Sequence, residues 1–200
     1  QGALGVSRET LARFDAYLAL LERWNPRINL VSRRSLGEAW QRHILDSAQL
    51  FALAHDRSGL WVDLGSGGGL PGIIIAIMAR EDKRFTVRMI EADTRKAAFL
   101  NHAIAELALP ATVEIERIEA AAPAEASVIS ARALAPLPRL LQLAAPFATA
   151  KTLCLFPKGR SAPAELTEAE AAWHIDATGV PSRSDPDGSV LVIRQFRARA

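Results

Sequence analysis

Apolar residues at helical spacing predict two helices near the N-terminus. The first helix opens at Ser7 and carries apolar residues three or four positions apart, at Leu11, Phe14, Leu18 and Leu21. We expect it to end before Pro26, because proline disfavours the helical conformation of the residue that precedes it. Ser35 and Glu38 form a capping box for a second helix, which we predict through Ala54. Residues 1–57 are therefore predicted to form an N-terminal helical extension.

Short apolar runs alternate with helical segments from Leu60 onward. Strands are predicted at residues 60–64, 85–90, 112–116, 127–130, 152–156, 173–177 and 189–196. Helices are predicted from residue 73, over 95–107 and over 136–147. Turn-forming residues at 182–188 separate the last two strands, which should form a hairpin. The alternation predicts an α/β fold over residues 58–200, with a seven-stranded, mostly parallel sheet and helices on both faces.

A glycine-rich stretch joins the first predicted strand to the next helix. Gly65 follows the strand directly, and Gly67, Gly68 and Gly69 follow after one residue. Glycines are needed where the backbone takes a positive φ or where a ligand lies against the main chain. Pro71 suits the first turn of the helix, whose free N–H groups face a ligand above the carboxyl end of the strand. We predict a ligand-binding loop; the alternative is a glycine-rich hairpin beside a helix.

Two ligand classes use such a loop. The Gly-x-Gly-x-x-Gly of residues 67–72 matches the dinucleotide fingerprint, which leaves a nicotinamide-dependent oxidoreductase open. Asp63, two residues before Gly65, extends the pattern to Asp-x-Gly-x-Gly-x-Gly, which resembles motif I of class I S-adenosylmethionine-dependent methyltransferases. The next strand ends about 20 residues later in Glu91, whose carboxylate can accept hydrogen bonds from ribose hydroxyls. The predicted strands fit the Rossmann-like sheet of that class, which is parallel except for one strand.

The composition indicates an ordinary globular protein of one domain. Of the 200 residues, 50% are hydrophobic and 23% are charged, and no apolar run reaches the roughly 18 residues of a membrane span. The chain begins without a signal-peptide pattern, and the missing initiator methionine suggests a processed start. Cys154 is the single cysteine, so no internal disulfide can form and we expect a cytoplasmic protein.

The charge balance is nearly even, but the basic residues are clustered. The chain has 24 lysines and arginines, and its formal net charge is +2. The planar guanidinium of arginine suits phosphate and base recognition, yet the overall balance does not favour or exclude a nucleic-acid partner. Clusters occur near the second predicted helix, after the fifth predicted strand, and near the C-terminus at Arg194, Arg197 and Arg199.

Six motifs, in a consistent order from about Trp24 to the C-terminus, resemble one protein family. They are Asn29-Leu30, Arg42-His43-Ile44-Leu45-Asp46-Ser47, Asp63 to Gly72 with Leu70-Pro71-Gly72, Arg117-Ile118-Glu119, Ile129-Ser130-Ala131-Arg132-Ala133, and Lys158-Gly159. The family is that of the bacterial 16S ribosomal RNA guanine-N7 methyltransferases, also called glucose-inhibited division protein B or ribosomal RNA small-subunit methyltransferase G. One departure is Ser66-Gly67-Gly68-Gly69, which replaces the Thr-Gly-Pro-Gly of some members and should leave cofactor binding intact.

The resemblance implies a reaction and a set of contacts. The methyl acceptor is N7 of one guanine in 16S ribosomal RNA, met as naked RNA, an assembly intermediate or the small subunit, and the donor is S-adenosylmethionine. The implied cofactor-binding residues are Gly65, Ser66, Gly67, Leu70, Glu91, Ile118, Glu119 and Arg132. Because N7 carries a free lone pair, neither a general base nor a metal is required, and catalysis is mainly positioning. The candidate catalytic residues are Arg132, Lys158, His43 and Asp46, and a monomer is expected.

Two groups of basic residues should flank the cofactor site and bind RNA phosphates. Arg33, Arg34 and Arg42 lie near the connector that we expect beside the mouth of the site. Lys158 and Arg160 follow the fifth predicted strand on the same carboxyl edge of the sheet. We predict that they form a phosphate track. The alternative is that they are solvated charges at helix ends.

Other functions stay open at this point. A methyltransferase of the same fold could act on a small molecule or a protein, and a non-catalytic protein could bind ribosomal RNA without transferring a methyl group. His43 and Asp46 lie three residues apart on one helix face, so they could form a hydrogen-bonded surface pair. Placed over the cofactor instead, they would close the methionine end of its site or contact RNA.

Overall fold

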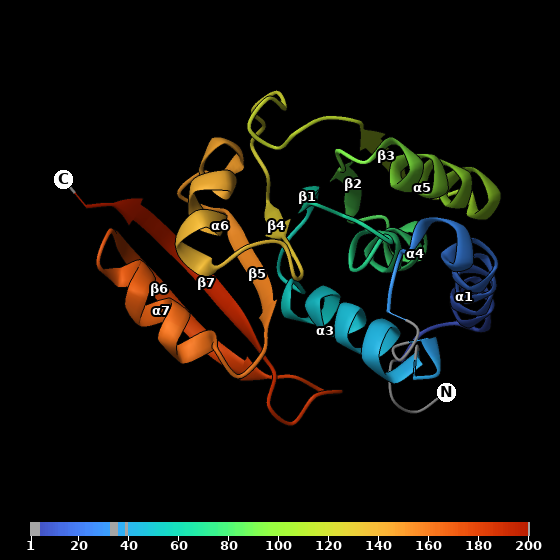
Figure 1. Cartoon of the computed structure of the whole chain (residues 1–200), viewed down its shortest axis with the longest axis horizontal. Coiled ribbons are helices and arrows are strands. Elements are labelled where there is room, and N and C mark those ends of the chain that lie inside the picture. The colour runs from blue at the N-terminus through green and yellow to red at the C-terminus, as the bar shows by residue number, and fades with distance from the viewer. Residues whose placement is uncertain (1–4, 33–35, 39, 200) are drawn as a thin grey trace.

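A seven-stranded sheet runs through the molecule (Figure 1). The computed structural model describes residues 5–32, 36–38 and 40–199. The strand order is β3-β2-β1-β4-β5-β7-β6, and the neighbouring strands are parallel except in the two pairs that involve β7. The predicted α/β class, the single antiparallel strand and the C-terminal hairpin are confirmed.

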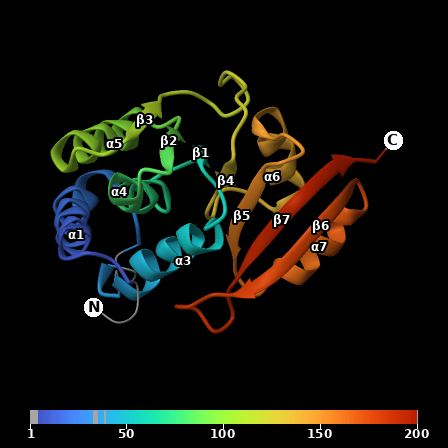
Figure 2. The same ribbon diagram turned by 180° about the vertical axis from the view of Figure 1, so that it is seen from behind.

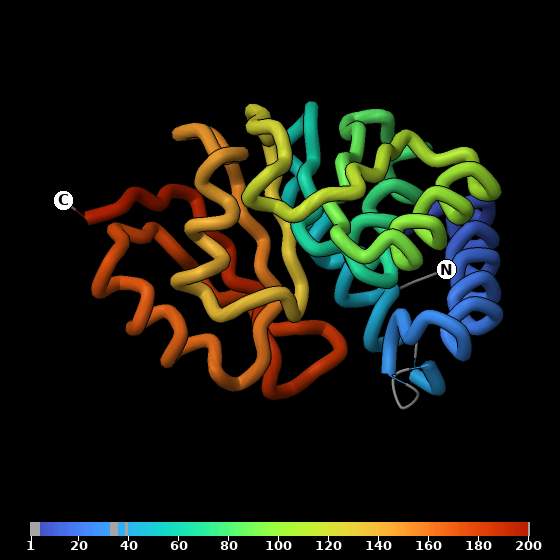
Figure 3. Tube along the Cα trace, turned by 45° about the horizontal axis from the view of Figure 1, so that its top comes forward, coloured from blue at the N-terminus to red at the C-terminus, as the bar shows by residue number. Residues whose placement is uncertain are grey.

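The strands lie close to their predicted positions. They are β1 (Gly59–Leu64), β2 (Phe85–Ile90), β3 (Ala111–Glu114), β4 (Val128–Ser130), β5 (Leu153–Lys158), β6 (Trp173–Pro181) and β7 (Ser189–Ala198). The largest difference is in β6, which continues past the predicted residue 177 because it pairs with β7 along its whole length. The β6–β7 hairpin lies at the opposite end of the molecule from the N-terminal helix (Figure 3).

Helices cover both faces of the sheet (Figures 1 and 2). One face carries α1 (Arg8–Ile28), α3 (Asp46–Leu53), α4 (Gly72–Asp82) and α5 (Thr94–Leu107); the other carries α6 (Leu137–Ala144), continued by η2 (Ala145–Phe147), and α7 (Ala162–Glu170). In β5, Leu153 and Leu155 join the core on the first face, whereas Cys154 and Phe156 join the core on the second. Burial on both faces explains the continuous apolar runs of the central strands. Among the described residues, none of the helices has the length and apolar character that crossing a membrane requires.

The first helix is longer than predicted. It continues through Pro26 to Ile28 and is capped by Asn29, whose φ of 51° is left-handed. Pro26 removes one backbone donor from the last turn, but the N–H of Asn29 still donates to the carbonyl of Asn25 over 3.0 Å. The buried side chain of Asn25 also accepts from the N–H of Val31 over 2.9 Å. These local bonds hold the turn together, so the predicted end before Pro26 is wrong.

The second predicted helix consists of two elements. A π-helix, η1 (Trp40–Leu45), continues directly into α3. The predicted capping residue Ser35 lies outside the described residues. Single-turn π-helices widen the helical turn and are common at functional sites. A pattern of apolar residues at a spacing of 3.6 cannot distinguish such a turn from an ordinary helix.

The sequence pattern did not predict α7. Its residues are mostly alanine and glutamate, and only Ala162 and Ala169 are buried. Small apolar side chains give little amphipathic signal, although a proline in the first turn is typical of a helix start. The missed helix matters because it carries Glu165, which contacts a candidate site residue.

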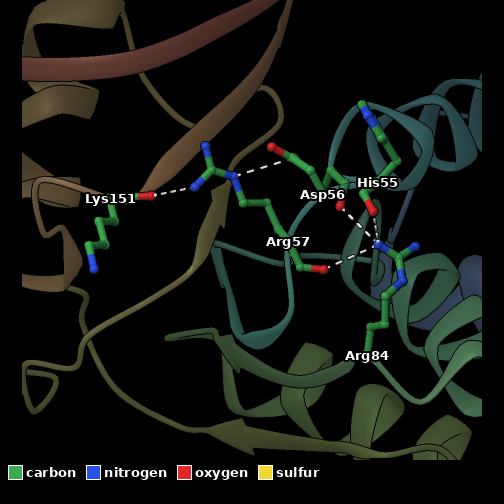
Figure 4. Close-up of polar contacts among 6 residues, drawn as sticks. His55, Asp56, Arg57, Arg84 and Lys151 are labelled. Atoms are coloured by element: carbon green, nitrogen blue, oxygen red, sulfur yellow. Dashed lines mark hydrogen bonds and ion pairs between the residues drawn. The ribbon is translucent and has the colours of Figure 1, made fainter.

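Arg84 anchors the end of α3 at the amino edge of the sheet (Figure 4). Its Nη1 donates to the carbonyls of Ala54, His55 and Arg57 over 3.1, 2.7 and 3.2 Å. These carbonyls follow the last turn of α3, where no further helical N–H is available to them. Because this end is fixed, the opposite end of α3, which begins at Asp46, is held at the carboxyl edge of the sheet.

Candidate functional site

A cavity of about 630 Å³ opens at the carboxyl ends of β1, β2 and β4. We call it the glycine-loop cavity, because residues 65–68 and Leu70 line it. The loops after β1, β2, β3 and β4 bring together in it all the residues predicted to bind a cofactor, namely Gly65, Ser66, Gly67, Leu70, Glu91, Ile118, Glu119 and Arg132. Open parallel sheets bind ligands at this edge.

The glycines of the loop serve different purposes. Gly65 has a positive φ of 64°, and a Cβ there would stand 2.6 Å from Cδ1 of Leu134. A side chain at this position would therefore meet Leu134, not only a ligand as the sequence suggested. A Cβ on Gly72 would stand 2.7 Å from Sδ of Met89, so this glycine permits the helix to approach β2. A Cβ on Gly67 would meet no atom closer than 3.9 Å, so the space above the backbone at this glycine is open to a ligand.

Glu91 joins the glycine loop to the end of β2. Its Oε2 accepts from the N–H of Gly67 over 2.7 Å, and its Oε1 accepts from the N–H of Asp93 over 2.8 Å. The carboxylate is 9% exposed and lines the glycine-loop cavity. Each carboxylate oxygen can accept more than one hydrogen bond, so capacity for a ligand hydroxyl remains. The ribose contact of Glu91 stays a prediction.

A buried polar chain lies beneath the loop. Oγ of Ser130 donates to Oδ1 of Asp63 over 2.6 Å and accepts from Nε1 of Trp61 over 2.9 Å. Complete burial raises the pKa of Asp63 to about 6, although the bond from Ser130 opposes this effect. These hydrogen bonds tie β1 to β4 beneath the glycine loop. They give Asp63 of the motif a structural role.

Tyr17 is a positioning residue that the sequence did not reveal. It is fully buried in α1, and its hydroxyl donates to the carbonyl of Gly68 over 2.5 Å. Through this bond α1 holds the glycine loop in place. The connector after α1 also contributes Leu30, Val31 and Ser32 to the cavity. The available signal was that Tyr17 is the only tyrosine in the chain and lies on the apolar face of a helix.

His43 and Arg132 meet at the rim of the glycine-loop cavity. Nη1 of Arg132 lies 3.2 Å from Nδ1 of His43, and Nη2 donates to the carbonyl of Arg42 over 3.1 Å. Since a guanidinium can only donate, Nδ1 must accept and the proton of the neutral ring sits on Nε2. Burial and the neighbouring guanidinium lower the pKa of His43 to about 4. Nε2 has no hydrogen-bond partner within the described part of the chain.

The possible pair of His43 and Asp46 does not form among the described residues. His43 contacts Arg132 instead, and Oδ1 of Asp46 accepts from Oγ of Ser182 over 2.8 Å. The π-helical turn before Asp46 changes the angular relation that an ordinary helix would give residues three apart. The two candidate catalytic residues therefore face different neighbours.

The predicted basic residues differ in their surroundings. Arg33 and Arg34 lie outside the described residues. The ammonium of Lys158, whose side chain is only 11% exposed, contacts Oε2 of Glu165 and the carbonyl of Ala135, each over 2.7 Å. The side chain of Arg160 is 84% exposed and pairs with an aspartate on the turn before β7 over 2.9 Å. Arg42 is also exposed and pairs within its own helical segment over 3.1 Å. Their RNA contacts stay predictions.

Comparison with known proteins identifies the family of this chain. The family model described as rRNA small subunit methyltransferase G matches residues 10–186. A ribosomal RNA small subunit methyltransferase G from Rhodospirillum centenum is 49% identical over 199 residues, which cover 100% of this chain and 90% of that protein. One from Parvibaculum lavamentivorans is 52% identical over 191 residues, which cover 94% of this chain and 84% of that protein.

Solved structures share the fold at low sequence identity. A methyltransferase from Geobacter sulfurreducens has a TM-score of 0.60 and 14% identity, with 94% of this chain and 96% of that chain covered. A TehB-like SAM-dependent methyltransferase from Corynebacterium glutamicum has a TM-score of 0.59 and 15% identity, with 90% and 98% covered. The fold, the residues gathered around the glycine loop and the relatives lead to one conclusion. This chain belongs to the rRNA small subunit methyltransferase G family, also called GidB.

Proposed function

We propose that this protein transfers a methyl group from S-adenosylmethionine to N7 of one guanine in 16S ribosomal RNA. The observation that carries the proposal is that all the residues implied to bind the cofactor line a single cavity in a member of this family. The family gives no support to a nicotinamide-dependent oxidoreductase. No contact in the described residues favours a small-molecule or protein acceptor over RNA.

The glycine-loop cavity fits S-adenosylmethionine. The open space above Gly67 would admit the methionine part of the cofactor, and the Glu91 carboxylate would bind the ribose. Ile118, with Glu119 beside it, would hold the adenine. His43 also lines this cavity, and its Nε2 is buried without a hydrogen-bond partner among the described residues. When bound, S-adenosylmethionine supplies an electrophilic methyl group on a sulfonium sulfur.

The residues of the site position the reactants and do not need to move a proton. N7 of guanine carries a free lone pair and no proton, so the attack does not require a general base. His43 is unsuited to be that base, because its Nδ1 already accepts from Arg132 and its pKa is lowered to about 4. Holding the reacting atoms in line can lower the barrier by roughly 7–11 kcal/mol. The anchored loop and the buried chain beneath it supply such rigidity.

The partner that we propose is 16S ribosomal RNA within the small subunit or an assembly intermediate. The exposed guanidinium groups of Arg42 and Arg160 support a phosphate track, and Arg33 and Arg34 belong to the proposed track by their place in the sequence. We further propose that the protein acts as a cytoplasmic monomer. Its single cysteine, which is buried, is consistent with a reducing compartment.

The proposed function is tested by a methyl-transfer assay. Cofactor with a labelled methyl group is incubated with the protein and with 16S RNA, assembly intermediates or small subunits from cells that lack the modification. Digestion to nucleosides should place the label in 7-methylguanosine. Label in another nucleoside, or transfer to free small molecules and not to RNA, would contradict the proposal.

A further inference from the structure

A second cavity adjoins the glycine-loop cavity. It has a volume of about 430 Å³, and residues 132–134 line both cavities. Its other walls come from the first residue of α3, the end of β5, α7, the turn between β6 and β7, and the start of β7. The functions assigned above do not use this space, although only three residues separate it from the proposed cofactor site.

The charges around the second cavity favour a base over a phosphate. Three carboxylates and two cations line it, namely Asp46, Glu165, Asp185, Arg132 and Lys158. Lys158 and Glu165 neutralise each other through an ion pair of 2.7 Å. The remaining carboxylates outnumber the remaining guanidinium, so a phosphate would meet net repulsion. A guanine that becomes cationic when N7 is methylated would be attracted.

Asp46 is the carboxylate best placed to contact a ligand. Glu165 accepts three hydrogen bonds, from Lys158 and the N–H of Leu137 at Oε2 and from Ser161 at Oε1, so it has less remaining capacity than Asp46. Asp46 begins a helix that is anchored at its other end, and its Oδ1 is held by Oγ of Ser182. Within the part of the chain that the structure describes, no hydrogen bond to its Oδ2 is formed.

The hydroxyl of Ser182 also stabilises the turn between β6 and β7, which forms another wall of the second cavity. Oγ of Ser182 accepts from the backbone N–H groups of Ser184 and Asp185 over 3.1 and 3.0 Å, so it can donate only to Asp46. Asp46 is thereby oriented by a turn that closes the cavity. The rings of Pro136 and Pro157 also line the space and offer flat apolar surfaces against which a base can lie.

We propose that the second cavity is a base pocket for the target guanine, in which the Asp46 carboxylate accepts hydrogen bonds from N1–H and the 2-amino group. The proposal rests on the proposed function, because it names the acceptor subsite of the same reaction. Enzymes that modify a base read its Watson–Crick edge in such pockets after the base leaves its stack. Only guanine presents two adjacent donors on this edge, whereas adenine places an acceptor at N1.

The orientation also suits the chemistry. N1 and N7 lie on opposite sides of a purine, so a guanine paired with Asp46 turns N7 away from that carboxylate. The proposal places N7 at the wall shared with the glycine-loop cavity. The new bond joins N7 to the methyl carbon while the carbon–sulfur bond breaks, and the positive charge passes from sulfur to the purine. This charge makes N1–H a stronger donor. The bond to Asp46 therefore strengthens in the transition state, which increases kcat as well as affinity.

A substrate analogue tests the base pocket without any protein variant. A 16S RNA ligated from two pieces can carry either guanine or hypoxanthine at the target position. Hypoxanthine lacks only the 2-amino group and keeps N7. Because one hydrogen bond to a charged acceptor is removed, kcat/KM of the wild-type protein should fall about 10- to 100-fold. Equal rates on the two RNAs would overturn the proposal.

Variants of the pocket assign the discrimination to Asp46. Asp46→Ala should lower kcat/KM on the guanine RNA about 10- to 100-fold and reduce the preference over hypoxanthine to less than about threefold. Asp46→Asn keeps one acceptor oxygen and should lose less. Asp185→Asn makes the same charge change in the same cavity and should leave the preference intact. Cofactor affinity should stay unchanged in all three, and Asp46→Ala should lower the thermal unfolding midpoint slightly because the hydroxyl of Ser182 loses its acceptor.

The outcomes separate this proposal from the proposed function. If the wild-type protein methylates the guanine RNA but Asp46→Ala keeps the full preference over hypoxanthine, the base pocket is wrong and the function stands. If the wild-type protein binds the cofactor yet transfers no methyl group to guanine in any RNA substrate, the function itself is contradicted. Should Asp46→Ala fail to fold, the analogue experiment on the wild-type protein still decides.

Discussion

The two cavities that meet at residues 132–134 are assembled in different ways. The glycine-loop cavity is built mainly from the loops that follow β1 to β4, and each loop contains a residue that the sequence predicts to bind the cofactor. The base pocket combines the start of α3, the end of β5, α7 and the turn before β7. The first arrangement follows from the order of strands in a parallel sheet. The second depends on contacts between segments far apart in the chain, such as the bond from Ser182 to Asp46.

Lys158→Ala should have the largest effect and tests whether the base pocket is held by internal bonds. Removing the ammonium leaves Glu165 without its cation in a setting where both side chains are mostly buried. The free energy of unfolding should fall by about 3 kcal/mol, measured by urea denaturation. Lys151→Ala removes an exposed lysine and should change stability by less than about 0.5 kcal/mol. Unchanged stability with a lower salt dependence of RNA binding would instead identify Lys158 as a phosphate ligand.

Asp63→Asn tests, through pH, the buried hydrogen-bonded residues beneath the glycine loop. The pKa of Asp63 is raised to about 6 in the folded protein from 3.8 when unfolded, so folding favours its neutral form. Its contribution to stability is fully present below pH 3.8 and is lost as pH rises through 6. Between pH 4 and pH 7 the wild-type protein should lose about 2 kcal/mol relative to Asp63→Asn, measured by urea denaturation at each pH. Parallel stability curves would contradict a buried, titrating Asp63.

Gly65→Val tests the wall between the two cavities. Valine is strained at a φ of 64°, and its Cβ would displace Leu134, which lines both sites. Affinity for S-adenosylmethionine should fall about 100-fold in titration calorimetry, while the sheet stays folded by circular dichroism. Gly179→Ala in β6, where a Cβ would meet nothing within 4 Å, is the matched control and should bind normally. A folded Gly65→Val protein with normal affinity would show that this loop does not bind the cofactor.

Glu91→Ala tests the ribose contact with a smaller expected loss. The change removes an acceptor for the ribose hydroxyls and frees the N–H of Gly67. Affinity for S-adenosylmethionine should fall about tenfold, with little change in the thermal unfolding midpoint. Glu91→Gln keeps one acceptor oxygen and should lose less. Normal affinity in the alanine variant would mean that Glu91 only shapes the loop.

Arg42→Ala and Arg160→Ala test the exposed surroundings of the two cavities. Each change should lower the slope of log affinity for RNA against log salt by about 0.7–0.9 for every phosphate that the arginine neutralises. Cofactor affinity should not change. Arg8→Ala is the control, because this exposed arginine begins α1 about 30 Å along the helix from the connector beside the cavity. A slope that is the same in all three variants would contradict the track at these two arginines.

The sequence predicted the glycine-loop cavity better than the base pocket for a physical reason. Gly65, Glu91 and Ile118 each follow a strand, and parallel strands place their carboxyl ends at one edge. Tyr17 and Ser182 act through single hydrogen bonds to distant segments, which no local pattern records. A helix was predicted over residues 40–45, but apolar spacing does not distinguish its π-helical form from an α-helix. The alanine-rich α7 was missed because small side chains give little amphipathic signal. Lys158 was interpreted from its charge, whereas its burial is a tertiary property.

A structure of the protein with S-adenosylhomocysteine and a target RNA fragment would locate the cofactor product and the guanine at once. We expect the cofactor product in the glycine-loop cavity and the guanine in the base pocket. The Watson–Crick edge of the guanine should lie at Asp46, with N7 directed toward the wall of residues 132–134. A guanine bound outside this pocket, or one whose N7 faces Asp46, would show that the base pocket is wrong.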